Sequence, residues 1–255
     1  MSNQLQGMRK AEVKEIRSFE IDFFPEVTYD GRKINAAAFG PAAYNSNVNR
    51  IKTTSLNEMP LRELTTTESL AVASYNFTNF AKPLIFNPSW LQAGYVLRDV
   101  EGVWINPLRD TNGNVIMDGK ALESRLNNLK KANGIYLFDK DTSFVPYDSF
   151  KQGVQEHETF LEGGLARGLV HTSDKKAITL SSVANNIEYH KGVNVFGFDS
   201  VTKPVLRVVC LDSDRLVDGG RLNVDGSWSD GYGGYALGGL VSGEASEAKN
   251  SEVQR

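Results

Sequence analysis

PVLRVVCLD, at residues 204–212, is a nearly continuous apolar run. A strand buried on both faces of a sheet has this composition, because neither of its two alternating sets of side chains meets water. We therefore predict a central strand here, with Cys210 as a small apolar core residue. Because Cys210 is the chain's single cysteine, an internal disulfide and a zinc site built from several cysteines are excluded.

Further strands are predicted on the N-terminal side of this run. Two pairs of β-rich runs are each joined by a turn signal, Asp30-Gly31 within 19–39 and Asn112-Gly113 within 103–119. Such dipeptides between β-rich runs are typical of hairpins. Shorter single strands are expected at IYLFD (135–139), around Leu169 and at VNVFGFD (193–199).

Helices are predicted where apolar residues recur at helical spacing. In 120–133, Leu122, Leu126 and Leu129 fall at positions i, i+4 and i+7, and Gly134 follows as an end signal. The other candidates are 68–80, 181–190, and 148–161 with Phe150, Val154, His157 and Leu161 on one face and Gly163-Gly164 at its end.

Together these elements predict a single α+β domain over residues 18–241, with a mixed β-sheet, two or three helices, long polar loops and extended termini. With 40% apolar and 23% charged residues, the 255-residue chain has the composition of a folded domain. Residues 40–68 are rich in Asn, Thr and Ser and are expected to form a long loop.

Both ends of the chain are polar. Residues 1–17 are expected to form an N-terminal arm whose Val13 and Ile16 give a thin apolar edge that needs a partner surface, and residues 242–255 a polar C-terminal tail. No apolar run is long enough to cross a bilayer, and the N-terminus lacks the apolar segment of a signal peptide. We therefore expect a cytoplasmic protein without a membrane partner.

Nine glycines fall between Gly219 and Gly243, where Trp228, Tyr232 and Tyr235 are the large aromatic side chains. Aromatic anchors on a flexible loop are common in recognition surfaces, so we expect this segment to contact a partner. In an alternative, Arg215 and Arg221 contact the phosphates of a nucleic-acid strand and the three aromatic residues stack on its bases. Five aspartates in 212–230 would repel phosphates, which favours protein as the partner.

Two Asp-x-Asp pairs follow predicted strands, Asp139/Asp141 and Asp212/Asp214. A strand followed by Asp-x-Asp resembles the magnesium sites of haloacid-dehalogenase-like phosphotransferases and of metal-dependent glycosyltransferases. The two pairs would face one cleft if their strands were parallel neighbours. The alternative is that both are polar turns that end buried strands.

Other catalytic and metal-binding patterns are incomplete. Asp110 begins a calcium-like loop, but Val115 and Ala121 stand where glycine and a bidentate glutamate are needed. His157-Glu158 lacks the second histidine of a zincin helix, and neither a serine-hydrolase elbow nor a Walker sequence is present. The sequence therefore predicts no catalytic residues, no metal and no cofactor.

The hypothesis favoured by these observations is a structural subunit, not an enzyme, that assembles with copies of itself or with other subunits, such as a head, neck or tail protein of a phage virion. Its contacts would come from Val13, Ile16, Arg221, Trp228, Tyr232 and Tyr235. One alternative is a nucleic-acid-binding subunit of a ribonucleoprotein or replication complex. Another is a magnesium-dependent phosphoryl or glycosyl transferase that uses Asp139 and Asp141.

Overall fold

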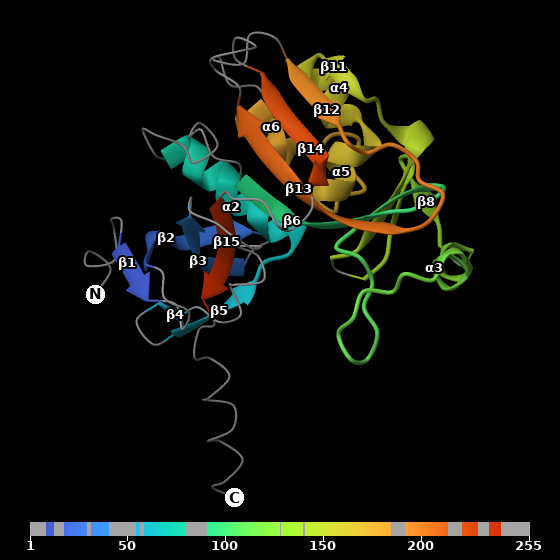
Figure 1. Ribbon diagram of the computed structural model, residues 1–255. Helices are drawn as coiled ribbons and strands as arrows, with labels where there is room; N and C mark the ends of the chain where they lie inside the picture. The colour runs from blue at the N-terminus through green and yellow to red at the C-terminus, as the bar shows by residue number, and fades with distance from the viewer. Residues whose placement is uncertain are drawn as a thin grey trace, which may run out of the picture.

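A computed structural model gives the architecture of the protein (Figure 1). Its helices and mixed β-sheet confirm the predicted α+β class. The residues that the structure describes are 9–12, 18–29, 32–40, 55–56, 59–79, 91–127, 129–139, 141–184, 192–213, 221–228 and 235–240.

The predicted central strand lies in the middle of the sheet. β13 (Val205–Ser213) pairs antiparallel with β6 (Leu91–Arg98) on one side and with β14 (Leu222–Trp228) on the other. Cys210 is 2% exposed, as predicted, and burial raises the pKa of its thiol well above the usual value. A buried thiol with a raised pKa is a poor nucleophile, so Cys210 contributes packing.

The sheet extends from β13 in both directions. Its main path runs β1-β2-β3-β15-β6-β13-β14-β12-β11, with parallel pairs at β15–β6 and β12–β14. The outer strands of this path are β1 (Arg9–Glu12), β2 (Ser18–Tyr29), β3 (Arg32–Gly40), β15 (Tyr235–Leu240), β12 (Val193–Phe196) and β11 (Gly153–Gln155). A branch from β6 holds β7 (Gly102–Ile105), β10 (Ser143–Pro146), β9 (Ile135–Leu137) and β8 (Lys131–Ala132), while β4 (Ser55–Leu56) and β5 (Met59–Glu63) join at β15.

Alternating side chains of the branch serve two different cores. In β7, Val103 and Ile105 belong to the large core, whereas Trp104 between them belongs to a smaller one. In β10, Val145 faces the large core and Phe144 the smaller one. Since successive strand residues point to opposite faces, the two cores lie on opposite faces of the sheet.

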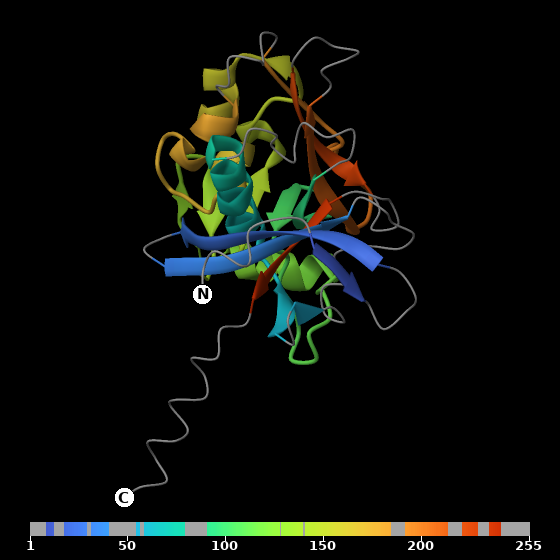
Figure 2. The ribbon, with the colours of Figure 1, turned by 90° about the vertical axis from the view of Figure 1, so that its left-hand side faces the viewer.

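Helices cover the two faces unequally. α2 (Thr66–Asn79), α4 (His157–Glu162), α5 (Gly164–Leu169) and α6 (Ser181–Ala184) gather on the face of the large core, together with the short 3-10 turn η4 (Ile178–Leu180) (Figures 1 and 2). α3 (Gly119–Leu126) lies apart from them and packs Leu122 into the smaller core. The 3-10 turn η3 (Tyr147–Ser149) follows β10.

The close approach of α2 to the sheet depends on a β-bulge. The register between β6 and β13 shifts at Val209/Cys210, which leaves one extra residue on β6 beside Gly94 at φ +130°. A Cβ on Gly94 would lie 2.5 Å from Oγ1 of Thr66. Gly94 therefore serves both the bulge and the helix contact, for which a side chain leaves no room.

Several predicted elements are confirmed. The hairpin around Asp30-Gly31 corresponds to β2 and β3, paired from Glu20/Gly40 to Tyr29/Arg32. The strands predicted at 135–139 and 193–199 correspond to β9 and β12, and the helix predicted at 68–80 corresponds to α2.

The helix predicted over 148–161 is wrong in its first half. Residues 147–149 form η3, and 153–155 form β11, which pairs with β12. Gly153 has φ +82°, a conformation that breaks a helix, and Val154 is 58% exposed instead of facing a core. Only α4, from His157 to the predicted end at Gly163, is helical.

The helix predicted over 120–133 ends early. α3 stops at Leu126, and Asn133 (φ 47°) and Gly134 (φ 90°) form the turn between β8 and β9. Positive φ at two consecutive residues is the conformation that Asn-Gly favours in two-residue hairpins. Of the two Asn-Gly dipeptides, Asn133-Gly134 therefore joins the strands of a hairpin. Asn112-Gly113 instead forms a turn closed by a single Arg109–Val115 bridge.

Three further expectations need correction. β4 and β5 lie within the predicted loop 40–68, and the predicted strand around Leu169 is the end of α5. The glycine-rich segment 219–243 supplies two sheet strands, β14 and β15, so its small residues serve strand pairing and are not all loop. In the N-terminal arm, residues 9–12 form β1 on β2, while the predicted tail 242–255 lies outside the described residues.

Candidate functional site

Of the predicted contact residues, Arg221 and Trp228 are the two whose side chains the structure describes. Arg221 precedes β14 and Trp228 ends it, and both are partly buried. Tyr235 begins β15, but its side chain is not among those described. Tyr232, Val13 and Ile16 lie outside the described residues.

The two aspartate pairs do not follow neighbouring strands. β9 and β13 are separated in the sheet by β10, β7 and β6, so the condition for a shared cleft, that the two strands are parallel neighbours, is not met. Oδ1 of Asp139 accepts the backbone N–H groups of Asp141 and Thr142 at 2.9 Å each, which is the geometry of a polar turn. Asp212 accepts from Nδ2 of Asn223 at 2.7 Å, and Asp214 lies outside the described residues. Within the described parts of the chain, no three His, Cys, Asp or Glu side chains cluster as a metal site.

Asn106 is the centre of a polar network that reaches the turn formed by Asp139. It follows β7 with φ 48°, and its Oδ1 accepts from the backbone N–H of Thr66 at 2.7 Å and from its hydroxyl at 2.8 Å. Its Nδ2 donates to the carbonyl of Asp141 at 2.9 Å, and its own carbonyl accepts from the hydroxyl of Thr142. Asn106 thus joins the start of α2 to the turn after β9.

A serine and a histidine lie beside this network. His171 has φ 49° and follows α5, where its N–H bonds the carbonyl of Gly168 and the next N–H bonds that of Arg167. This is a Schellman motif with histidine at the position that usually holds glycine. Nδ1 of His171 lies 2.9 Å from Oγ of Ser143, which is fully buried. A nucleophile with no exposure cannot meet a substrate, so the pair stabilises the fold.

The His171 environment makes stability depend on pH. Burial lowers the pKa of His171 below 6.5, although Asp141 and Asp139 act in the opposite direction. As pH falls below 6.5, the unfolded chain takes up the proton before the folded chain does, so stability decreases down to the lowered pKa. We expect wild type to lose more stability between pH 7.5 and 5.5 than His171→Asn, measured by urea denaturation.

Asparagine is the matched replacement because it tolerates positive φ and does not titrate. The expected result is a smaller pH-dependent change in the variant, whatever its absolute stability. Equal changes in the two proteins would show that His171 does not carry the effect.

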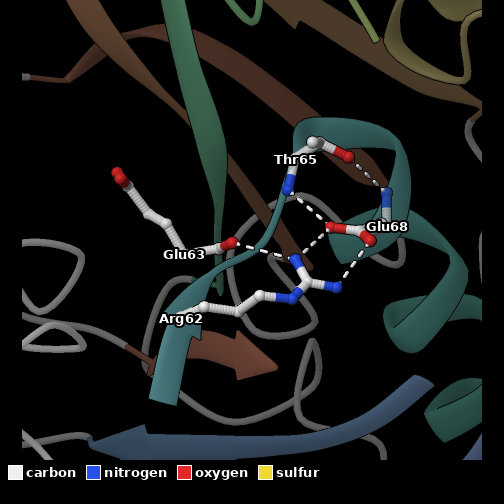
Figure 3. A network of polar contacts seen from close by, with 4 residues as sticks. All are labelled: Arg62, Glu63, Thr65 and Glu68. Carbon is white, nitrogen blue, oxygen red and sulfur yellow. Dashed lines mark hydrogen bonds and ion pairs between the residues drawn. The ribbon is translucent and has the colours of Figure 1, made fainter. Parts of the chain in front are cut away.

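The start of α2 is fully occupied by local contacts (Figure 3). Thr65 and Glu68 form a capping box, in which the Thr65 hydroxyl accepts from the Glu68 N–H and the Glu68 carboxylate accepts from the Thr65 N–H. Arg62 holds the same carboxylate through two bonds of 2.7 and 2.8 Å, and this pairing raises the pKa of Arg62. Because these N–H groups already have partners, the start of α2 has a structural role and leaves little capacity for binding an anion.

A groove lies beside α3. It consists of two adjoining hollows of about 340 and 480 Å³, which share Val100, Glu101, Leu126 and Phe144. We call this feature the α3 groove. A separate hollow beside Thr65 and Asn106 is about 180 Å³, smaller than pockets that hold organic ligands.

The apolar floor of the α3 groove belongs to the smaller core. Phe144 and Tyr136 have ring centroids 6.0 Å apart, and Phe144 also contacts Trp104 at 4.8 Å. Val100 stands at the edge with 50% exposure, on the turn between β6 and β7. The groove therefore presents apolar side chains from three separate segments on a rigid base.

Hydrogen bonds fix the turn that carries Val100. Oδ1 of Asp99 accepts the Val100 N–H at 2.8 Å, and Nε1 of Trp104 donates to Oδ2 at 3.3 Å. The hydroxyl of Tyr147 donates to the carbonyl of Asp99 at 2.8 Å, and burial raises the pKa of Tyr147 to about 12. Val100 is thus held outward by buried polar contacts.

Charged side chains of both signs surround the α3 groove. Five charged residues form this rim; they are exposed, and they come from the β6–β7 turn, α3, β8 and η3. Lys131 and Asp148 lie 4.0 Å apart across one end. The rim consists of Glu101, Lys120, Glu123, Lys131 and Asp148. An apolar centre with a charged rim is the usual anatomy of a protein interface.

Comparison with protein-family models, curated proteins and solved structures gave no match. None of the described helices is long and apolar enough to cross a membrane. Inference about function therefore rests on the geometry of the chain itself.

Proposed function

We propose that this protein is an assembly subunit that associates with copies of itself through the α3 groove. The observation that carries the proposal is the apolar groove edge at Val100, which stays exposed although polar contacts fix its turn. The setting proposed for such a subunit is the head, neck or tail of a phage virion, and its proposed place of synthesis is the cytoplasm. The polar composition of the chain ends and loops is the reason for this setting.

The charge pattern of the rim favours a second copy as the partner. The rim of the groove carries two lysines and three carboxylates. In a two-fold interface the same patch meets itself, so a rim with both signs can place Lys120 or Lys131 of one copy opposite a carboxylate of the other. A rim of one sign would repel its own copy.

The same pattern supports protein over nucleic acid. Glu101, Glu123 and Asp148 would stand close to the phosphates of a bound strand, and the two lysines do not offset them. The nucleic-acid-binding alternative predicts binding that weakens steeply with salt. A magnesium-dependent transferase predicts thermal stabilisation by Mg²⁺ at Asp139 and Asp141.

The test is the mass of Val100→Asp against wild type, by light scattering and sedimentation over a concentration series. Each two-fold interface contains Val100 twice, so burying two unpaired carboxylates at about 2 kcal/mol each costs about 4 kcal/mol, and the dissociation constant should rise about 1,000-fold. The fold should be unaffected, because surface substitutions change stability by about 0.5 kcal/mol or less.

Ile178→Asp is the matched control, since Ile178 is 70% exposed and lies outside the α3 groove. It should associate as wild type does. A monomeric wild type, or equal weakening by both variants, would contradict the proposal. Loss of mass on nuclease treatment would favour the nucleic-acid alternative instead.

A further inference from the structure

Arg167 is a buried cation with few partners. It lies on α5 and is 8% exposed. The only hydrogen bond of its side chain among the described residues runs from one terminal nitrogen to the carbonyl of Lys175 at 3.5 Å, the outer limit for such a bond. Nε of Arg167 is buried and has no hydrogen-bond partner among the described residues.

No carboxylate in the described part of the chain forms an ion pair with Arg167. Glu162 acts on it electrostatically from the neighbouring helix, but burial has the larger effect and lowers the pKa of Arg167. The guanidinium nevertheless remains charged at neutral pH. Removing a charge from water costs several kcal/mol unless a counter-charge and hydrogen bonds compensate it.

Two short segments enclose the guanidinium. The other terminal nitrogen would lie 3.5 Å from a Cβ on Gly134, in the turn between β8 and β9. The second segment, residues 171–177, follows α5 and contains the Lys175 carbonyl. Asn133 donates to the carbonyl of Ser173 at 2.5 Å and so ties the two segments together. The position of the guanidinium is therefore fixed without an ion pair to any described carboxylate, and Glu162 acts on it only through the electrostatic interaction given above.

We propose that Arg167 binds a small oxyanion, with free phosphate as the chemical type. The planar guanidinium offers parallel N–H groups that match two oxygens of such an ion, and a charge-assisted pair of this kind supplies the missing compensation. A Cβ on Gly134 would be in van der Waals contact with the guanidinium, so glycine leaves this side of the group uncovered by a side chain. This site lies outside the α3 groove and is independent of the proposed assembly.

The experiment measures the melting temperature of the full chain against phosphate concentration, with chloride at matched ionic strength as the reference. Wild type should show a rise that saturates, and ³¹P line broadening of phosphate should report the same dissociation constant. Arg167→Met should bind phosphate at least about tenfold more weakly, because a hydrogen bond to a charged group is worth about 1.5–3 kcal/mol.

Two further variants separate specific binding from general charge effects. Arg109→Met removes an exposed arginine and should respond to phosphate as wild type does. Arg167→Lys keeps the charge without the planar group and should bind more weakly than wild type, which keeps the test available if Arg167→Met does not fold. Absence of a phosphate effect beyond chloride in wild type, or an equal effect in wild type and folded Arg167 variants, would overturn the proposal.

Discussion

Replacing Trp104 by alanine is expected to lower the free energy of unfolding by about 4 kcal/mol. Trp104 is fully buried, and its ring centroid lies 5.1 Å from that of Phe138 and 4.8 Å from that of Phe144. Removing the indole leaves a cavity in the small core and takes the Nε1 donor from Asp99. Urea denaturation followed by far-ultraviolet circular dichroism gives the difference.

Trp104→Phe separates the two contributions. It keeps an aromatic ring against Phe144 but removes the hydrogen bond to Asp99, so a loss of about 1–2 kcal/mol is expected. A loss below 1 kcal/mol for Trp104→Ala would show that the small core does not depend on this residue. Trp104→Ala should also weaken self-association, because the floor of the α3 groove rests on the same core; Val100→Asp should do so without a loss of stability.

The central strand could be predicted because its own apolar residues indicate that both of its faces are buried. A run that is apolar at consecutive positions leaves few alternatives to a strand with neighbours on both sides, and β13 has them. Alternation in β7 was harder to recognise, because Val103, Trp104 and Ile105 are all apolar and face two cores. The sequence therefore did not indicate that the sheet has a second covered face.

Local signals failed where strand pairing decided the outcome. Val154 and His157 fit a helical face by spacing, yet Gly153 adopts positive φ and Val154 pairs with β12. Asn133-Gly134 follows a helical pattern, which predicts a helix end, although the same dipeptide is a strong hairpin signal. The pairing of β9 with both β8 and β10 favours the hairpin.

The candidate sites could not be read from any one segment. The α3 groove combines the turn at Val100, α3 near Leu126, and the strands at Tyr136 and Phe144, which only the sheet order brings together. Arg167 gave no signal, since a lone arginine in a helix is usually exposed. The one available clue to the groove was Asp99-Val100-Glu101-Gly102, a turn-forming sequence before the apolar β7.

Asn106→Val is expected to lower the free energy of unfolding by about 4 kcal/mol, from two separate causes. The backbone and hydroxyl donors of Thr66, which is fully buried, lose their acceptor, and a buried donor left unsatisfied costs about 1–3 kcal/mol. In addition, a β-branched residue at φ 48° is strained by about 1–3 kcal/mol. Asn106→Gly loses the same hydrogen bonds without the strain, so it should be less destabilised than Asn106→Val by about the strain energy. Both values come from urea denaturation at one pH. Equal losses would place the whole effect in the hydrogen bonds, and a loss below 1 kcal/mol for both would show that Asn106 does not hold α2 to the turn after β9.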